Sequence, residues 1–411
     1  MRRLLFILPT IVLTTVVSGK TIIVGKNQSV TSIRKAIGLA KNNDTILVKA
    51  GIYKEGNIII NKNIVLLGEG FPAIDGENKY EIFTVSGSGV VIKGFQFQNS
   101  GQSAVNDYAA IKVLDSKKIV VENNRIVNSF FGIHFSNSSF ITVKNNNITG
   151  MPASEQNTGN GIHLWKCNNA LIDNNHITGH RDGIYFEFVN ESTIQNNLSE
   201  KNIRYGLHFM FSNNDNYFHN IFNNNGAGVA VMYSHKVRME RNRFEMNWGP
   251  SSYGILLKDI TDSHIQHNTF FKNSVGIHME GSSRINASKN IFKENGWAIK
   301  VQASCDDNNF YLNNFFGNSF DIATNGTMVL NKFYNNYWDK YDGYDRNKDE
   351  MGDVPYHPVS MYSMIVEHNP NSLILLRSFM VSLLDRAERA IPSLTPENLT
   401  DEKPMIRPNK L

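Results

Sequence analysis

Histidine and methionine recur at regular intervals in the middle of the chain, and their side chains point to metal chemistry. His163, His208, Met210 and Met232 carry imidazole and thioether groups, and Glu187 lies among them in sequence. Imidazole and thioether suit copper(I), whereas magnesium and calcium prefer oxygen ligands. If the fold brings these side chains together, we expect them to bind copper(I) or to touch a copper-loaded partner. The alternative is that they only stack in ladders along neighbouring strands.

These intervals belong to a repeat that runs through most of the chain. A small residue recurs every 22 to 29 residues, and an asparagine follows it after 14 residues in eight of nine repeats. A period in this range is typical of solenoid proteins. The small-residue positions, called anchors below, are Ala110, Gly132, Gly161, Gly183, Gly206, Gly228, Gly254, Gly276, Ala298 and Asp321. The asparagines are Asn124, Asn146, Asn175, Asn197, Asn220, Asn242, Asn268, Asn290 and Asn313.

After each anchor the residues alternate between apolar and variable, as in Ile133 and Phe135 or Leu207 and Phe209. This period of two predicts a strand with one buried face. Asparagine and glycine at the corners suit the left-handed backbone of sharp turns. We therefore predict an all-β fold, a right-handed parallel β-helix with three short strands in each coil.

In such strands the second and fourth residues after the anchor point away from the core. Strands of neighbouring coils lie about 4.8 Å apart, so outward side chains one coil apart can reach one ion. Two insertions, residues 149–160 and 247–253, precede the anchors Gly161 and Gly254 and are expected to overhang the same face. The two outward columns place on four consecutive coils the residues His163, Trp165, Tyr185, Glu187, His208, Met210 and Met232.

The ends of the chain depart from the repeat. Residues 1–19 have a basic start and an apolar run, which predicts a signal peptide and a soluble, exported mature chain. Residues 20–330 form the predicted β-helix, with an amphipathic helix at 32–41 closing its open end. Residues 331–360 read as an aromatic and acidic capping segment. Residues 361–411 hold a predicted helix at 372–391 and a polar tail expected to be extended or disordered.

Composition excludes some functions. The formal net charge is only +4, and we find no basic run interleaved with aromatic residues, which argues against nucleic acid as a partner. Cys167 and Cys305 lie about six coils apart in the predicted register, too far for a disulfide, so we predict two free thiols.

A carbohydrate-active enzyme, either a polysaccharide lyase or a hydrolase, is the competing function, because many β-helix proteins act on polysaccharides. A glycosidase needs two carboxylates that converge on one cleft. The acidic residues here are scattered over separate coils, and the adjacent pair Asp306 and Asp307 is better explained as a solvated corner. We therefore expect no enzyme and assign no catalytic residue.

Several strings resemble one family. GNGIHLWKC, HRDGIYFEF, RYGLHFMFS, GVAVMYS, NWGPSSYGILLKD, NNYWDKYDGYD and GDVPYHP look like segments of NosD proteins, which serve in the maturation of nitrous oxide reductase. The resemblance covers nearly the whole mature chain. It implies a β-helical, periplasmic accessory protein that helps to assemble the copper–sulfide centre of the reductase. It also implies the partners: the permease and ATPase of an ABC transporter, a copper-chaperone lipoprotein and the reductase itself.

Two further regions are candidates for binding. The helix at 372–391 is too charged to span a membrane but carries more apolar residues than a solvated helix needs. It therefore either docks on the transporter or folds back along the β-helix. We expect partner contacts from Trp165, Tyr185, Trp248, Leu373, Leu376, Arg377, Met380 and Leu384.

The second region is the acidic loop of the capping segment, where Asp345, Asn347, Asp349 and Asp353 offer oxygen atoms. Glu350 stands where a calcium loop uses glycine for its sharp turn. We therefore expect an ordered cap and at most a weak calcium site.

Overall fold

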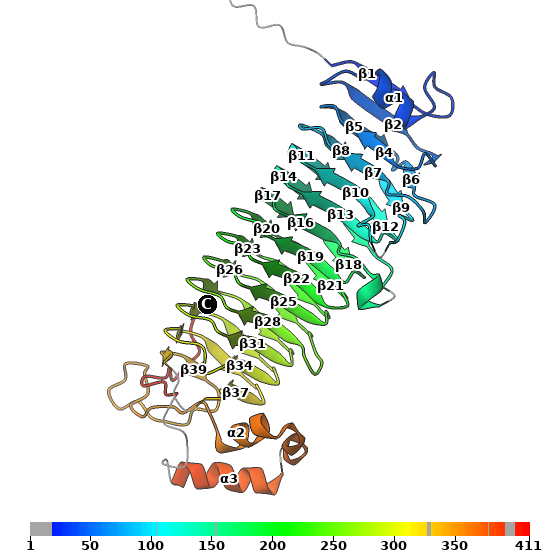
Figure 1. Ribbon diagram of the computed structural model, residues 1–411. Coiled ribbons are helices and arrows are strands. Elements are labelled where there is room, and N and C mark those ends of the chain that lie inside the picture. Colours follow the sequence, from blue (N-terminus) through cyan, green and yellow to red (C-terminus); the bar gives the residue numbers. More distant parts are fainter. Residues whose placement is uncertain (1–18, 104, 153, 327–329, 377, 391–398) are drawn as a thin grey trace, which may run out of the picture.

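A computed structural model describes residues 19–103, 105–152, 154–326, 330–376, 378–390 and 399–411 of the chain. Its strands form three long parallel sheets that wrap around an elongated rod (Figure 1). Each complete coil adds one strand to each sheet, and each strand pairs in register with its equivalents in the neighbouring coils. The prediction of a right-handed parallel β-helix is confirmed, with about 14 turns.

The sheets are named A, B and C. Sheet A contains β1 (Thr21–Val24), β2 (Thr45–Lys49), β5 (Val65–Glu69), β8 (Val91–Lys93), β11 (Lys117–Glu122), β14 (Ser139–Lys144), β17 (Asn168–Asp173), β20 (Thr193–Gln195), β23 (Asn216–Phe218), β26 (Arg238–Glu240), β29 (His264–Gln266), β32 (Asn286–Ser288), β35 (Asn309–Tyr311) and β38 (Lys332–Tyr334). Sheet B contains β3 (Ile52–Tyr53), β6 (Ala73–Asp75), β9 (Gln96–Gln98), β12 (Arg125–Val127), β15 (Asn147–Thr149), β18 (His176–Thr178), β21 (Leu198–Glu200), β24 (Ile221–Asn223), β27 (Arg243–Glu245), β30 (Thr269–Phe271), β33 (Ile291–Lys293), β36 (Asn314–Phe316) and β39 (Tyr337–Trp338). Sheet C contains β4 (Ile58–Ile60), β7 (Phe83–Val85), β10 (Ala109–Leu114), β13 (Phe131–Ser136), β16 (Ile162–Trp165), β19 (Asp182–Glu187), β22 (Tyr205–Met210), β25 (Ala227–Met232), β28 (Tyr253–Lys258), β31 (Val275–Glu280), β34 (Trp297–Val301) and β37 (Phe320–Ala323).

A short helix closes the N-terminal end of the rod. Helix α1 (Ile33–Leu39) lies within the predicted span 32–41, and Ser32 caps it by accepting a hydrogen bond from the Lys35 backbone N–H. Glu55 accepts further hydrogen bonds from the first backbone N–H groups of the helix. The buried face of α1 covers the first coils, which protects the open edges of their strands.

The repeated asparagines form a buried ladder between sheets A and B. In each coil the side-chain amide donates to the side-chain oxygen of the asparagine in the next coil, for example from Asn197 to Asn220 at 2.9 Å and from Asn220 to Asn242 at 3.0 Å. The left-handed backbone expected at the corners is present, but not at the ladder asparagines themselves. The positive φ falls on the preceding residue, such as Asn196 or His219, so the ladder positions need the amide and not its backbone freedom.

The anchors face the interior. A Cβ built on Gly206 would lie 2.7 Å from the Gly228 carbonyl oxygen and 2.9 Å from the ring of Phe222. Close approach of successive coils therefore requires glycine here. Because the anchor points inward, the residue before it points outward on sheet C. The free cysteines Cys167 and Cys305 are both buried.

The insertions lie at the return from sheet B to sheet C. The first connects β15 to β16 and contains the short helix η1 (Glu155–Asn157), and the second connects β27 to β28. The other half of the coil, from the anchor to the ladder asparagine, keeps a length of 14 residues in eight of nine repeats, so the extra residues fall in this return.

The C-terminal region differs from the prediction of one helix at 372–391. It contains α2 (Met361–His368), the 3-10 helix η2 (Pro370–Leu375) and α3 (Phe379–Ala390). Tyr362 and Val381 from these helices bury themselves against Trp297 and Phe320 of sheet C, and Lys300 pairs with Glu367 at 2.6 Å. One face of the helical region thus folds back on the β-helix (Figure 1).

The tail was expected to be extended or disordered, and its described part fits the first alternative, because it pairs with the last coil through isolated bridges. Residues 399–411 pack on the last coil, with Leu399 and Asp401 buried. Asp401 accepts hydrogen bonds from the amide of Asn336 and from the indole N–H of Trp338. Its carboxylate therefore ends the asparagine ladder by supplying the acceptor that a next coil would have offered.

Candidate metal-binding face

The two predicted outward columns lie side by side on sheet C. Their strands are β16, β19, β22 and β25, in which His163 pairs with Tyr185, and Tyr185 with His208. In the second column Glu187 pairs with Met210, and Met210 with Met232. We call this surface the His–Met face; it consists of His163, Trp165, Tyr185, Glu187, His208, Met210 and Met232.

The first column is outward but covered. His208 is only 3% exposed and Tyr185 9%. Side chains from the residue before each anchor cover this column: the ring of Tyr205 lies 4.9 Å from that of His208, and Phe131 lies 5.5 Å from His163. These residues cover the column because the anchor points inward, so that the residue before it points outward. The imidazoles are therefore packed among aromatic rings and are not free in solvent.

His163 and His208 do not meet. The ring of Tyr185 lies between them, with centroid distances of 4.7 Å to His163 and 4.9 Å to His208. His163 has a partner of its own, because its Nδ1 lies 3.1 Å from the amide nitrogen of Asn160. Burial lowers the pKa of His163 well below its usual value, so this imidazole is neutral. The structure thus supports the ladder interpretation for His163.

Tyr185 connects the two columns. Burial, followed by the charges of Glu187 and Asp182, raises the pKa of Tyr185 to about 12, so its hydroxyl stays protonated. This hydroxyl donates to the sulfur of Met210 at 3.7 Å. Glu187 lies at the half-buried end of its strand beside Tyr185.

The residues that the fold brings together are His208, Met210 and Met232. His208 and Met210 project from the same strand, and Met232 follows Met210 in the next coil. Both nitrogens of His208 are buried without a hydrogen-bond partner in the described structure. In the described residues no group of three or more His, Cys, Asp and Glu side chains could hold a metal ion. A metal site on this face would therefore have to use the thioethers, and one imidazole with two thioethers fits copper(I).

Sequence reasoning missed Asp182. This carboxylate is completely buried, and its Oδ2 lies 3.7 Å from His208 Nδ1 and 3.5 Å from Arg181 Nε. Asp182 directly precedes the anchor Gly183. If the in–out alternation of side chains along β19 continued to this residue, the Asp182 side chain would point into the core. The available signal was that no other anchor is preceded by an acidic residue.

The chain matches two families of known proteins. The family described as "Periplasmic copper-binding protein (NosD)" matches residues 144–344, which include the whole His–Met face. A family described as "Right handed beta helix region" matches residues 26–166. A protein of Pseudomonas aeruginosa named "Probable ABC transporter binding protein NosD" is 29% identical over 385 residues, covering 87% of each chain. A protein of the same name from Stutzerimonas stutzeri is 27% identical, covering 87% of this chain and 86% of its own.

The chain is a NosD-type protein. Among solved structures, a family 28 exopolygalacturonase of Yersinia enterocolitica is similar with a TM-score of 0.61 and 11% identity, covering 77% of this chain and 78% of its own. At that identity the likeness shows the β-helix fold alone.

The predicted partner contacts of this NosD-type chain fall into two groups. Trp165 and Tyr185 belong to the packed face, where the Lys166 ammonium lies 4.3 Å above the Trp165 ring. Trp248, in the second insertion, is 64% exposed. In the C-terminal helices Leu373 and Met380 are exposed, Leu384 is half-buried, and Leu376 packs against the sheet C cluster. Arg377 lies outside the described residues.

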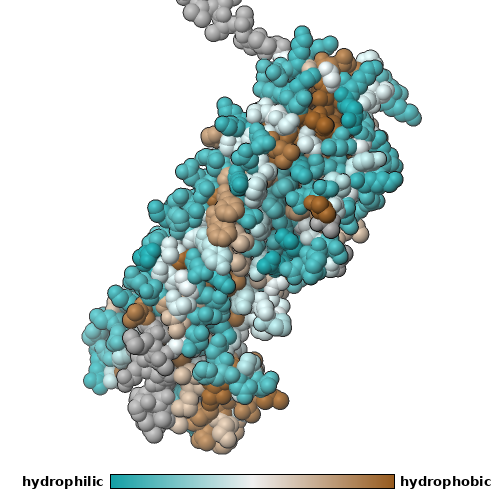
Figure 2. Space-filling model, viewed as in Figure 1, coloured by the Kyte–Doolittle hydropathy of each residue, from teal (hydrophilic) through white to brown (hydrophobic). Residues whose placement is uncertain are grey.

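Apolar side chains gather on the outer side of the C-terminal helices of the NosD-type chain (Figure 2). Ile374 is 88% exposed and Phe379 is 81% exposed. In the described part of the chain, no helix has the length and apolar character needed to cross a membrane.

The capping segment covers the last coil with Trp338, whose ring stacks on Phe315 at 4.0 Å. In the acidic loop, Asp345 accepts backbone hydrogen bonds from Lys348 and Glu350, and Asp353 accepts one from Arg346. Asn347 and Asp349 each accept a hydrogen bond from the backbone two residues on. These bonds hold the loop in a defined shape; whether it binds calcium stays a prediction.

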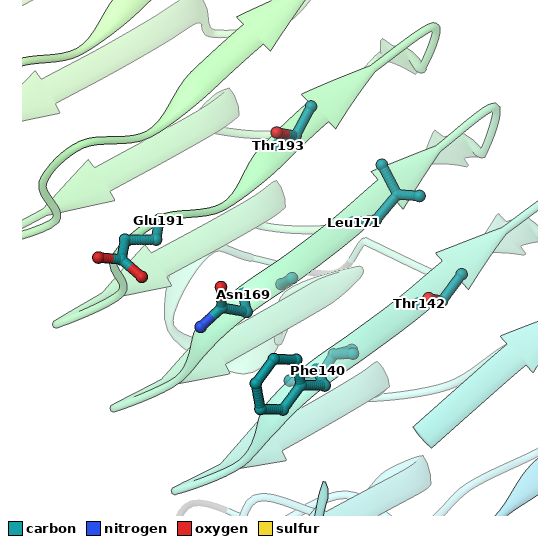
Figure 3. A pocket seen from close by; sticks show the side chains of 8 residues that line it. Phe140, Thr142, Asn169, Leu171, Glu191 and Thr193 are labelled. Atoms are coloured by element: carbon teal, nitrogen blue, oxygen red, sulfur yellow. The ribbon is translucent and has the colours of Figure 1, made fainter. Parts of the chain in front are cut away.

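A hollow on the outer face of sheet A lies on a different sheet from the His–Met face (Figure 3). Glu191 is the one acidic side chain in its lining, so the hollow lacks the paired carboxylates of a glycosidase. The residues that line it are Phe140, Ile141, Thr142, Asn169, Ala170, Leu171, Glu191 and Thr193.

Proposed function

We propose that this chain is a periplasmic accessory protein for maturation of the copper–sulfide centre of nitrous oxide reductase, and that it catalyses no reaction. Its partners are the permease and ATPase of an ABC transporter, a copper-chaperone lipoprotein and the reductase. The description of the matching family supports copper binding, and the names of the relatives support association with an ABC transporter.

The observation that carries this proposal is the pairing of Met210 with Met232 on adjacent coils, next to His208. Copper(I) is the cargo here. A site of two thioethers and one imidazole favours copper(I) over zinc. Both methionines are half-buried, so part of each residue is open to a partner protein. Parallel pairing fixes their backbones about 4.8 Å apart without any movement of the fold.

The test replaces both thioethers. Met210→Ala with Met232→Ala should weaken copper(I) binding at least tenfold in competition with a chromophoric copper(I) chelator, because two soft ligands are removed. The matched control is Met151→Ala with Met246→Ala, which removes two exposed methionines elsewhere and should change the affinity less than twofold. Unchanged affinity and unchanged maturation of the reductase in the first variant would overturn the copper role.

Docking on the transporter is assigned to the exposed side of the C-terminal helices. Truncation after Pro370 would also remove Asp401 and the tail that covers the last coil, so loss of binding in that variant would be ambiguous. The sharper variant is Ile374→Ser with Phe379→Ser, since both side chains are exposed. It should lose association with the transporter and keep its melting temperature; retained association would refute docking through this surface.

A carbohydrate-active enzyme is the alternative function, because many β-helix proteins act on polysaccharides; the likeness to the exopolygalacturonase shows only the shared fold. The two candidates differ in a direct measurement. Turnover of polyuronides without measurable copper(I) binding would favour the enzyme, and the reverse result would favour the accessory protein.

A further inference from the structure

Asp182 is the one acidic residue at its position of the repeat. The residues that directly precede an anchor point outward on sheet C, and the others are Ala109, Phe131, Asn160, Tyr205, Ala227, Tyr253, Val275, Trp297 and Phe320. These nine coils show that the fold accepts apolar, aromatic or amide side chains at this position. The β-helix therefore does not require a carboxylate at position 182.

Placing a carboxylate there is costly. Asp182 is 0% exposed, and its Oδ2 has no partner at hydrogen-bond distance. A buried charge without full compensation costs several kcal/mol. Asp182 Oδ1 accepts a 3.3 Å hydrogen bond from the Tyr205 backbone N–H, which a neutral amide oxygen could accept equally well. The free Oδ2 is therefore the part of Asp182 that needs an explanation.

Two N–H donors lie near Oδ2: Arg181 Nε at 3.5 Å and His208 Nδ1 at 3.7 Å. The guanidinium of Arg181 is about one-third exposed, whereas His208 is almost completely buried. The distance to His208 is longer than a hydrogen bond, but such bonds are often long in unliganded sites and shorten on binding. The second ring nitrogen, Nε2, has no partner in the described structure.

This arrangement matches a known way of preparing a histidine as a metal ligand. A carboxylate that accepts the N–H of one ring nitrogen fixes the tautomer and leaves the other nitrogen with a free lone pair. The neighbour of His208 in the coil that carries Met232 is Ala230, one of the two alanines in this column, so little side-chain bulk lies beside His208 on that side.

We propose that Asp182 is a positioning residue that holds His208 as the Nδ1–H tautomer, so that Nε2 is available to copper(I). This inference rests on the proposed function, since it assigns a role at the same face. Arg181 then balances the charge of Asp182 from the solvent side. The competing explanation is that Asp182 serves only as the ion-pair partner of Arg181.

The first measurement needs no metal. With 15N-labelled histidine at about pH 8, above the ordinary pKa of histidine, the ring-nitrogen shifts of His208 report its tautomer. The wild-type protein should show Nδ1–H. Asp182→Asn keeps the shape and the acceptor for Tyr205 and should shift His208 towards Nε2–H, whereas Arg181→Gln should leave the tautomer unchanged. A wild-type ring with Nε2–H overturns the proposal, and does so even if Asp182→Asn fails to fold.

The second measurement is copper(I) affinity, again by competition with a chromophoric chelator. Asp182→Asn should weaken binding about 10- to 100-fold, as loss of an outer carboxylate typically does, and Arg181→Gln should change it less than twofold. Equal losses in the two variants would favour the ion-pair explanation and overturn the proposal. The two proposals can also fail separately. If the Nδ1–H tautomer depends on Asp182 but the protein binds no copper(I), the proposed function is overturned and the orienting role of Asp182 is supported.

Discussion

Replacing one asparagine of the buried ladder by its isosteric acid should destabilise the protein in a pH-dependent way. Asn220 is completely buried, and its Oδ1 accepts hydrogen bonds from the backbone N–H of Asn197 at 3.0 Å and from its side-chain amide at 2.9 Å. Its own amide nitrogen donates to the Ile194 carbonyl at 2.9 Å and to Asn242 Oδ1 at 3.0 Å. In Asn220→Asp, a carboxyl oxygen replaces this amide nitrogen. When the carboxyl group is ionised, that oxygen faces the two acceptors and has no proton to donate.

The magnitude follows from these contacts. When it is protonated, the introduced carboxyl group can donate only one of the two hydrogen bonds, so below about pH 4 the loss is about 1–2 kcal/mol. Burial against two acceptors should raise its folded-state pKa by about 3 units or more above the unfolded value of about 3.9. Because the folded pKa is the higher one, the extra cost is absent at low pH and grows as the pH rises. At pH 7 it adds about 4 kcal/mol, for a total of about 5–6 kcal/mol.

The assay is urea unfolding of wild type and variant at about pH 4 and at pH 7, with the difference taken at each pH so that the titration of other groups cancels. Asn224→Asp is the control, since Asn224 is exposed in the same repeat at a φ of 52°, which aspartate tolerates. It should stay within about 0.5 kcal/mol of wild type. An equal loss for Asn220→Asp at both pH values, or no loss at pH 7, would refute the hydrogen-bond reasoning.

The buried histidines, the stacked rings, the tail and the acidic loop give four more tests. Burial lowers the pKa of both His134 and His180 to about 4, so the stability present above about pH 6.5 is lost as the pH falls towards 4; the urea midpoint of His180→Asn should fall less over this range than that of wild type. Phe270→Ala removes a ring stacked at 4.8 Å on both of its neighbours and should cost about 3–5 kcal/mol in urea unfolding, whereas a loss below about 1 kcal/mol would contradict its place in the core. Asp401→Asn leaves too few acceptors for the N–H groups around it and should cost about 1–3 kcal/mol, with faster amide exchange at Asn336; unchanged exchange would show that the tail does not cap the ladder. A calcium chelator should leave the melting temperature unchanged within about 2 °C, and a larger fall would establish a calcium site in the loop that contains Asp345.

The sequence alone determined the repeat and its register. The anchors and asparagines recur because every coil must meet its neighbours in the same way, so a local pattern reports a global fold. The pairing of Met210 with Met232 followed directly from their equal distances to Gly206 and Gly228. The site of the insertions followed from the constant length of the other half-coil.

Only the tertiary structure decided what surrounds those positions. Alternation along one strand could not show that Tyr205 covers His208, or that Tyr185 separates it from His163, because both depend on side chains of other coils and on the inward anchor. The inward anchor Gly183 also interrupts the alternation along its strand, and Asp182 therefore lies beside His208.

The ends of the chain show the same limit. Composition described the tail as polar. Asp401 is held in place because it accepts a hydrogen bond from Asn336, the last asparagine of the ladder, which lies 65 residues earlier in the sequence. A repeat specifies its own interior through contacts that recur from coil to coil. What closes the repeat, and what covers its faces, depends on contacts that occur once and leave no periodic trace in the sequence.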